Sequence, residues 1–366
     1  MSAPSLPIFG TVNARDDRWT AERARDWYAA VAPLQGCNYV PSAAVNSLDM
    51  WAADRFDASL IDCELALAAG LGMNTLRVFL HDLAHRADPA GFLRRVDAFL
   101  TVAQRHGIRP LLVFFDDCWD APATGPQPPP IPGVHNSRWI QSPGIEAAAD
   151  PAQRPRLEAY VRDVVRAFGR DGRVLAWDVY NEVTNFFLRH LAKSEPMKSL
   201  GLVSTMVRRR LGDKPTLALA DEACAWIRDE GTDHPLTLAS WYSESWLNEQ
   251  LYAWSDVLSF HSYEDAAAVA AQIDALEVHG RPILCTEWLS RPQGSTVEAV
   301  LPVLRKRNVA SYNWGLVDGA TQVKYGWEDS GEGGGGEPEL WFSDLLRADG
   351  TPYREAEAAL LRARGD

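Results

Sequence analysis

The sequence predicts an α/β fold, a single (β/α)8 TIM barrel with long rim loops that takes in residues 1–366 as one domain. Eight apolar runs with strand character alternate with amphipathic helical patterns, which is typical of parallel βαβ units closed into a barrel. The length suits one barrel with insertions. An open doubly wound sheet would usually carry a glycine-rich phosphate loop after its first strand, and residues 35–41 do not form one.

The elements follow in order along the chain. The strand-like runs are residues 34–40, 74–80, 109–115, 174–180, 236–241, 257–263, 282–288 and 310–315. The helical patterns are residues 57–70, 91–106, 153–169, part of 185–230, 265–279, 296–307 and a last one near 353–364. Gly70, Gly107 and Gly280 follow apolar periodic stretches, where helix C-caps belong.

Three stretches exceed simple connections. Residues 116–150 are rich in proline and follow the third strand, so we expect this segment to fold over the C-terminal mouth of the barrel, because loops of such length are usually functional. Residues 185–214 read as a helical insertion, whose basic run at 208–210 we interpret as a solvated helix face. Residues 331–336 are a flexible glycine-rich break before the C-terminal segment.

Composition excludes several classes of partner. The formal net charge of −13 argues against nucleic acid and anionic membranes, which need basic patches. The cysteines, at positions 37, 63, 118, 224 and 285, are scattered without metal-ligand spacing, so we expect buried free thiols and neither a disulfide framework, a metal nor a cofactor. No signal peptide or run of 18 apolar residues is seen. We therefore expect a cytoplasmic protein, unless a leader was removed; the oligomeric state stays open.

Two glutamates carry the chemical prediction. Glu182 follows the fourth strand-like run and Glu287 closes the seventh. In a parallel barrel both strand ends reach the same rim, where such barrels place their active sites. Two carboxyl groups that face each other across a sugar perform glycoside hydrolysis. The 14 tryptophans suit this interpretation, because a flat apolar ring matches the face of a pyranose.

The strand ends carry further landmarks, namely Arg77, Asn181, His261, Tyr263 and Trp314. Together with the two glutamates they resemble clan A glycoside hydrolases, and are most similar to the cellulase-like family five. The resemblance extends from Asn38 to Tyr353. It implies that Glu182 is the acid/base and Glu287 the nucleophile, with their carboxyl groups about 5–5.5 Å apart as in retaining enzymes.

Each role has a physical requirement. Glu182 needs a raised pKa from burial and from the neighbouring Glu287, which must itself stay ionised. Arg77 and Tyr263 supply a positive charge and a hydrogen bond for that purpose. The remaining roles concern the sugar. Asn181 would form a hydrogen bond with the sugar 2-hydroxyl, and Trp314 would lie under the sugar ring at the cleavage point. His261 would form a hydrogen bond with Glu182 or with the leaving group.

The sequence departs from the family at the third strand. Asp116 and Asp117 stand where a histidine is usual, and they either bind sugar hydroxyls or cap the next segment; the same alternatives apply to His81 and Asp82. Further candidate substrate contacts, each with core packing as the alternative, are Asn38, Trp51, Trp119, His135, Asn136, Trp139, Trp241 and Trp288.

These observations favour a retaining β-glycosidase that acts on small β-linked oligosaccharides or glycosides from a chain end. The alternatives are an endo-acting β-glycanase of the cellulase, mannanase or xylanase type, a transglycosidase, and an inactive sugar-binding barrel. A metal-dependent barrel hydrolase would want a His-x-His on the first strand, where Asn38 and Tyr39 stand instead. The sequence leaves the sugar configuration and the linkage open.

Overall fold

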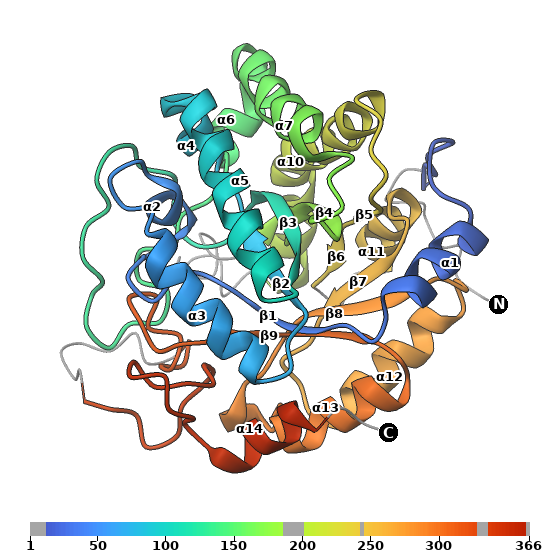
Figure 1. Ribbon diagram of the computed structural model, residues 1–366. Helices are drawn as coiled ribbons and strands as arrows, with labels where there is room; N and C mark the ends of the chain where they lie inside the picture. The colour runs from blue at the N-terminus through green and yellow to red at the C-terminus, as the bar shows by residue number, and fades with distance from the viewer. Residues whose placement is uncertain (1–11, 186–200, 242–244, 328–335, 364–366) are drawn as a thin grey trace.

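The computed structural model describes residues 12–185, 201–241, 245–327 and 336–363. Its centre is a nine-stranded sheet, parallel throughout, in the order β5-β4-β3-β2-β1-β9-β8-β7-β6. The two ends of this order, β5 and β6, belong to one strand-like run of the sequence, so the sheet closes on itself. The predicted (β/α)8 barrel is confirmed (Figure 1).

All eight predicted strand positions are occupied. The strands are β1 (Gln35–Asn38), β2 (Thr75–Phe79), β3 (Arg109–Asp116), β4 (Ala176–Asn181), β5 (Leu236–Thr237), β6 (Ala239–Ser240), β7 (Leu258–His261), β8 (Ile283–Trp288) and β9 (Ala310–Trp314). The fifth run splits at Leu238, whose N–H is donated to the Ser255 hydroxyl at 2.9 Å. That bond takes the place of a ladder bond, and therefore one run yields two short strands.

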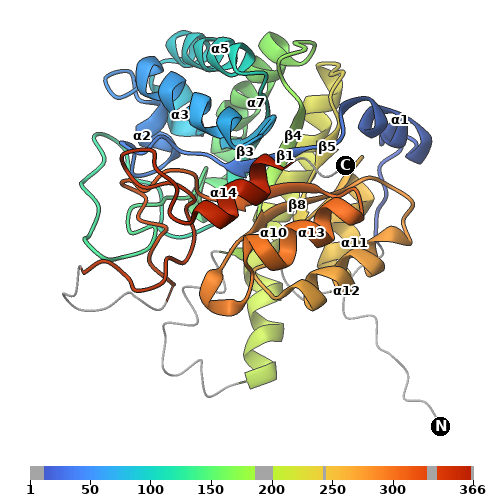
Figure 2. The same cartoon turned by 60° about the horizontal axis from the view of Figure 1, so that its bottom comes forward.

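Helices surround the barrel on all sides in the two views (Figures 1 and 2). The predicted patterns became α3 (Ala58–Gly70), α5 (Pro89–Arg105), α7 (Arg154–Phe168), α10 (Gly201–Asp229), α12 (Ala266–Glu277), α13 (Val297–Lys306) and α14 (Glu355–Arg362). Helices that the sequence analysis did not predict are α1 (Ala21–Val31), α2 (Ser47–Trp51), α4 (Asp82–Ala87), α6 (Ile145–Ala149) and α11 (Ser245–Trp254).

The cap predictions were right at two of three glycines. Gly107 and Gly280 lie just beyond helix ends with φ of 69° and 63°, in the left-handed region. Gly70 is still helical, and Gly72, with φ of 80°, takes the left-handed position instead. Part of the predicted insertion, residues 186–200, lies outside the described residues, as do the side chains at 208–210 and most of the glycine-rich break at 331–336.

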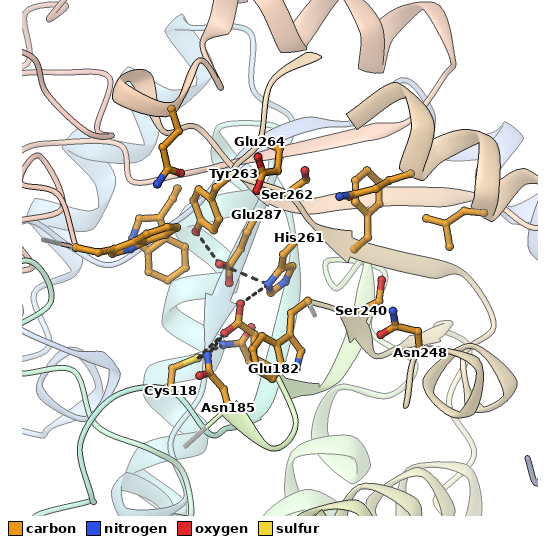
Figure 3. A pocket seen from close by; sticks show the side chains of 18 of the residues that line it. Cys118, Glu182, Asn185, Ser240, Asn248, His261, Ser262, Tyr263, Glu264 and Glu287 are labelled. Atoms are coloured by element: carbon orange, nitrogen blue, oxygen red, sulfur yellow. Dashed lines mark hydrogen bonds and ion pairs between the residues drawn. The ribbon is translucent and has the colours of Figure 1, made fainter. Parts of the chain in front are cut away.

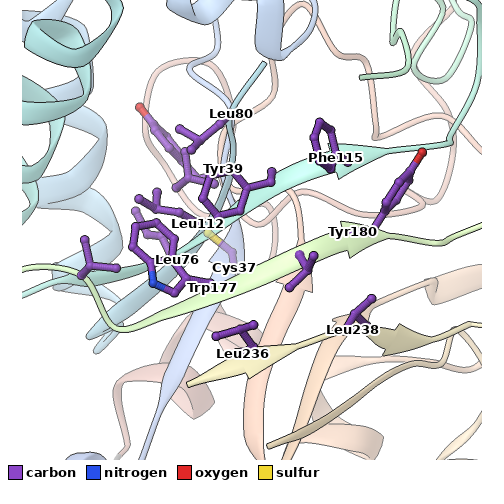
Figure 4. Close-up of a cluster of buried hydrophobic side chains, with 14 of the residues drawn as sticks. Cys37, Tyr39, Leu76, Leu80, Leu112, Phe115, Trp177, Tyr180, Leu236 and Leu238 are labelled. Atoms are coloured by element: carbon purple, nitrogen blue, oxygen red, sulfur yellow. The ribbon is translucent and has the colours of Figure 1, made fainter. Parts of the chain in front are cut away.

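The main core lies between the strands and the surrounding helices. Strand side chains such as Leu76, Leu112 and Trp177 (Figure 4) belong to one buried cluster with Phe99 of α5 and Tyr160 of α7. A second cluster joins Leu111, Ala176, Leu284 and Ala310, which come from strands on different sides of the barrel. Their side chains therefore fill its interior, and the space left for a site is at the C-terminal mouth.

The segment between β3 and α6, residues 117–144, is called the rim loop below. Hydrogen bonds hold this loop both near its ends and at Asn136. Backbone bridges join Asp116 to Ser142 and Asp120 to Ile140, and the N–H of Asn136 is donated to the carbonyl of Thr321 at 2.9 Å. The loop is thus bonded to the segment that follows β9.

In the part of the chain that the structure describes, no helix has the length and apolar character needed to cross a membrane.

Candidate active site

Five strands deliver the landmark residues to one end of the barrel. Parallel pairing explains this, because the C-terminal ends of all strands point to the same mouth. The residues lie on β2 (Arg77), at the end of β4 (Asn181 and the following Glu182), at the end of β7 (His261), on β8 (Glu287) and at the end of β9 (Trp314). Figure 3 shows Glu182, His261, Tyr263 and Glu287 facing one another.

Glu287 is held by charged and neutral donors. Its Oε1 accepts from Nη1 of Arg77 at 2.8 Å, and its Oε2 accepts from the Tyr263 hydroxyl at 2.7 Å. Its side chain is buried, with 6% exposed. Both carboxylate oxygens therefore have a partner, in a geometry that favours the ionised form.

Arg77 is itself fully buried and organises the floor of the site. Its guanidinium lies 2.7 Å from Asp178, and it donates to Oδ1 of Asn38 at 3.0 Å and to Oδ1 of Asn181 at 2.6 Å. A buried guanidinium needs such partners, because an unpaired charge in the interior is costly. Arg77 and Asn38 thus support the side chains of Glu287 and Asn181 from behind, and neither residue lines the cavity described below.

The contacts of Glu182 include an imidazole, a thiol and a side-chain amide. Its Oε1 lies 2.8 Å from Nδ1 of His261, its Oε2 lies 3.1 Å from the Sγ of Cys118, and Asn185 donates to the same Oε2. The backbone of Glu182 has φ of 45°, an uncommon conformation for a residue with a side chain. Such outliers cluster at functional sites, where the surrounding contacts maintain them.

The two carboxyl groups approach closely. One oxygen of Glu182, one oxygen of Glu287 and one ring nitrogen of His261 lie within 4.8 Å of one another. Among the residues that the structure describes, this trio is the one group with ligand-type atoms near enough to hold a metal ion. The Arg77 guanidinium, 2.8 Å from Glu287, already supplies positive charge there and opposes a cation.

The carboxyl groups open into a cavity of about 910 Å³. Of the residues predicted from the sequence, those that line it are Trp119, His135, Asn136, Trp139, Asn181, Glu182, Trp241, His261, Tyr263, Glu287 and Trp314. Four of these come from the rim loop. Trp139 and Trp314 meet edge to face, with ring centroids 5.7 Å apart. Aromatic rings thus form part of the wall, and such rings can pack against the apolar face of a sugar.

Other predicted contacts do not line the cavity. His81 caps α4 by accepting the N–H of Leu83, and Asp82 is paired with Arg156 and Ser142. Trp51 and Trp288 are fully buried in the main core. These side chains serve packing and helix capping, which is the alternative that the sequence left open for them.

The two aspartates at the end of β3 are also internal. Asp116 accepts from the indole of Trp139 at 2.6 Å and from the amide of Asn181 at 2.9 Å. Asp117 accepts from the Tyr180 hydroxyl and from the Thr184 N–H, each at 2.7 Å. Both carboxyl groups therefore brace the loop that carries Glu182 and are occupied by protein donors.

Burial shifts the proton affinities of the site. It raises the pKa of Glu287 above its usual value; the nearby Glu182 adds to this, whereas His261, Arg77 and Tyr263 oppose it. Burial lowers the pKa of His261 to about 4, so the imidazole is neutral near pH 7. Burial raises the pKa of Asp116 to about 6 and that of Asp117 to about 8.

Several neighbours of the pair were missed by the sequence analysis, namely Cys118, Asp178, Asn185 and Trp327. Asp178 had a signal, since a carboxylate inside an apolar strand needs a buried cationic partner. Cys118 and Asn185 had none, because each reaches Glu182 through loop geometry that periodicity does not encode. Trp327 lies in the segment after β9, and packs edge to face on Tyr263 with centroids 4.9 Å apart.

Comparisons with known proteins bear on the fold. No protein-family model matches this sequence, and no curated protein sequence matches it significantly. Among solved structures, Bacteroides uniformis beta-glucuronidase 2, covalently bound to cyclophellitol-6-carboxylate aziridine, is 15% identical with a TM-score of 0.57, over 91% of this chain and 36% of its own. The exo-beta-1,4-mannosidase from Opitutaceae bacterium strain TAV5 is 19% identical with a TM-score of 0.56, over 90% and 59%.

GH5_18 from Streptomyces cattleya, in complex with GlcNAc, is 16% identical with a TM-score of 0.56, over 92% of this chain and 82% of its own. The present chain thus spans 36% and 59% of the first two proteins and most of the third. At such identities the similarity shows a shared barrel fold. The chemistry of this chain has to be argued from its own side chains.

Proposed function

We propose that this protein is a retaining β-glycosidase, a hydrolase of O-glycosyl bonds with Glu287 as nucleophile and Glu182 as acid/base. The observation that carries the proposal is the approach of the two carboxyl groups, with oxygens within 4.8 Å at the mouth of the barrel. Retaining enzymes keep their carboxyl groups about 5–5.5 Å apart, whereas inverting enzymes leave about 6.5–9.5 Å for a water molecule. The folds of the β-glucuronidase and the exo-mannosidase add general support.

In the first step an oxygen of Glu287 bonds to the anomeric carbon while the glycosidic C–O bond breaks. The proton of Glu182 moves to the departing oxygen, so the leaving group is released as a neutral alcohol. Arg77 and Tyr263 hold Glu287 in the ionised form that this attack requires. The product is a sugar ester on Glu287.

In the second step Glu182, now a carboxylate, takes a proton from water. The water oxygen bonds to the anomeric carbon, and the ester bond to Glu287 breaks. Two inversions give net retention of the β configuration. Neutral His261, 2.8 Å from Glu182, can orient this carboxyl group in both steps without adding a positive charge.

The shape of the cavity favours attack at a chain end. On one side the rim loop supplies Trp119, His135 and Trp139, and its bonds to the segment after β9 close that side. On the other side the cavity continues past Ser240 toward residues of α11 and α12. A pocket closed on one side accepts a terminal sugar and leaves room for the leaving group, whereas a groove open at both ends suits internal bonds.

A panel of 4-nitrophenyl β-glycosides and short β-linked oligosaccharides tests the proposal. The panel should include gluco, manno, xylo and glucurono configurations, because the fold does not decide among them. Proton NMR of the first product should show the β anomer, and a monosaccharide should appear alone at the earliest time points. An α anomer would contradict the retaining mechanism. A ladder of oligosaccharides from a soluble β-glycan would contradict the exo assignment and favour an endo-glycanase.

A further inference from the structure

A thiol lies against the proposed acid/base, in the space between the ends of β3 and β4 (Figure 3). The Sγ of Cys118 is 3.1 Å from Oε2 of Glu182 and lines the cavity, although the residue is only 7% exposed. Asp116 fixes this position, because its Oδ1 accepts the backbone N–H of Cys118 at 2.8 Å. The thiol is therefore part of the arrangement around Glu182 rather than a filler of the core.

The neighbours of the thiol determine the direction of its hydrogen bond. Two side-chain amides point at Sγ, with Nδ2 of Asn181 at 3.2 Å and Nδ2 of Asn185 at 3.5 Å. An amide nitrogen donates and cannot accept, so these contacts use the lone pairs of sulfur. The single hydrogen of the thiol is thereby left for a carboxyl group. Asp116 is one neighbouring acceptor, and Oε2 of Glu182, 3.1 Å from Sγ, is the acceptor that lies at the cavity.

We propose that Cys118 is a positioning residue for the acid/base, and that its thiol hydrogen bond to Oε2 sets the pH at which Glu182 releases its proton. This inference rests on the proposed glycosidase function, in which Glu182 supplies and recovers that proton. Cys118 acts through Glu182 and forms no bond with the sugar.

The thiol can do this because it stays protonated. Burial raises the pKa of Cys118 well above its usual value, and the negative charges of Asp116 and Glu182 add to that effect. A neutral donor stabilises the carboxylate form of Glu182 and so lowers its proton affinity. Since sulfur is a weak donor, the effect is smaller than that of a hydroxyl group in the same place.

Other groups around Glu182 also influence its titration. Among the described residues, the titratable and charged side chains that face it, or stand behind its neighbours, include Asp116, His261, Tyr263, Glu287, Arg77 and Asp178. All of them remain in place when residue 118 changes. Substitutions at this position therefore vary one donor against a constant electrostatic background.

The test compares Cys118→Ala, which removes the donor, with Cys118→Ser, which replaces it by a stronger one. Glu182 is titrated by carbon-13 NMR in protein labelled at the glutamate carboxyl carbon, and its signal is assigned by its loss in Glu182→Gln. We expect the Glu182 titration to move up by about half a pH unit in the alanine variant and down by a similar amount in the serine variant. The basic limb of kcat/KM should move in the same two directions.

Cys224→Ala is the matched control, because Cys224 is a buried cysteine of α10 outside the cavity lining. It should leave the titration of Glu182 unchanged. Titrations that stay in place in both Cys118 variants, or move in the same direction, would overturn the inference. If the two variants shift in opposite directions but the wild-type protein hydrolyses no glycoside, the hydrogen bond is supported and only the proposed function is overturned.

Discussion

The ends of β4 and β8 present the same residue type in different surroundings. Glu287 on β8 contacts a permanent cation, Arg77, whereas the contacts of Glu182 after β4 include the thiol of Cys118 and the amide of Asn185. This difference in surroundings supports the proposed roles of Glu287 as nucleophile and Glu182 as acid/base. The comparison teaches that the proposed roles of the two glutamates depend on the groups that contact each carboxyl group. Each prediction below concerns the surroundings of one glutamate or the other.

The largest effect should come from removal of either carboxyl group. Glu287→Gly should lower turnover by roughly 10⁴-fold or more, because no other group at the site replaces the nucleophile. Azide then fits the space left by the side chain and attacks an activated substrate directly, which gives the α-glycosyl azide. In Glu182→Ala the intermediate on Glu287 still forms, and azide converts it to the β-glycosyl azide.

Product NMR with 2,4-dinitrophenyl glycosides distinguishes these outcomes. The matched comparison is the pair of variants itself, since each keeps the carboxyl group that the other lacks. An exchange of the two anomers between the variants would reverse the assignment of nucleophile and acid/base.

Arg77→Ala should produce the next largest change. It removes the positive charge beside Glu287 and leaves buried Asp178 without its ion-pair partner, so we expect a fall of about 10²–10³-fold in kcat/KM and about 3–5 kcal/mol in unfolding free energy. Urea unfolding and steady-state kinetics measure the two effects separately.

Arg291→Ala controls for stability, because Arg291 and Glu357 form another ion pair with both side chains 1% exposed, away from the cavity lining. It should cost similar stability while the kcat of the folded protein is kept. Equal loss of kcat in both variants would mean that Arg77 serves the fold and has no specific effect on Glu287.

The surroundings of Glu287 depend on regular structure, and the sequence predicted them. Arg77 and Glu287 are strand residues, and alternation and parallel pairing bring strand ends together whatever the loops do. The predicted placement at one mouth followed from that rule alone. The barrel itself was predictable for the same reason, and three of the unpredicted helices, α2, α4 and α6, are short pieces within connections.

The other side depends on contacts that no local pattern encodes. Asp82 finds Arg156, which lies 74 positions away, and Asp116 finds the indole of Trp139 on the folded rim loop. Without those partners in view, the sequence left open whether each aspartate binds sugar hydroxyls or caps the next segment. Cys118 likewise became relevant only through its place beside Glu182.

Tyr263→Phe should have a moderate effect that is confined to the nucleophile side. The hydroxyl donates to Glu287 at 2.7 Å and opposes the rise that burial causes in the pKa of that carboxyl group. Its loss should raise the pKa of Glu287 further, so the acid limb of kcat/KM moves to higher pH by about half a unit to one unit. The basic limb, which reports Glu182, should stay in place. Movement of the basic limb alone would show that Tyr263 acts on Glu182 instead.

The smallest effect on turnover near pH 7 should come from Asp117→Asn, on the acid/base side. Burial raises the pKa of Asp117 to about 8, from an ordinary value near 3.8 in the unfolded chain. Between these values the folded protein holds a proton that the unfolded chain has released, so stability is greatest below about pH 4 and is lost as pH rises toward 8.

Asparagine keeps the size of the side chain and an acceptor for Tyr180 or Thr184, but it cannot ionise. We therefore expect the variant to lack this contribution, which is at most about 1.4 kcal/mol per pH unit for one proton. Urea unfolding of both proteins at pH 5, 6.5 and 8 measures it. The wild type should lose stability relative to the variant as pH rises, and parallel curves would contradict a proton on Asp117. A wild-type unfolding free energy that falls with pH relative to the variant would mean that a protonated acid holds the turn carrying Glu182. The end of β8 relies instead on the fixed charge of Arg77.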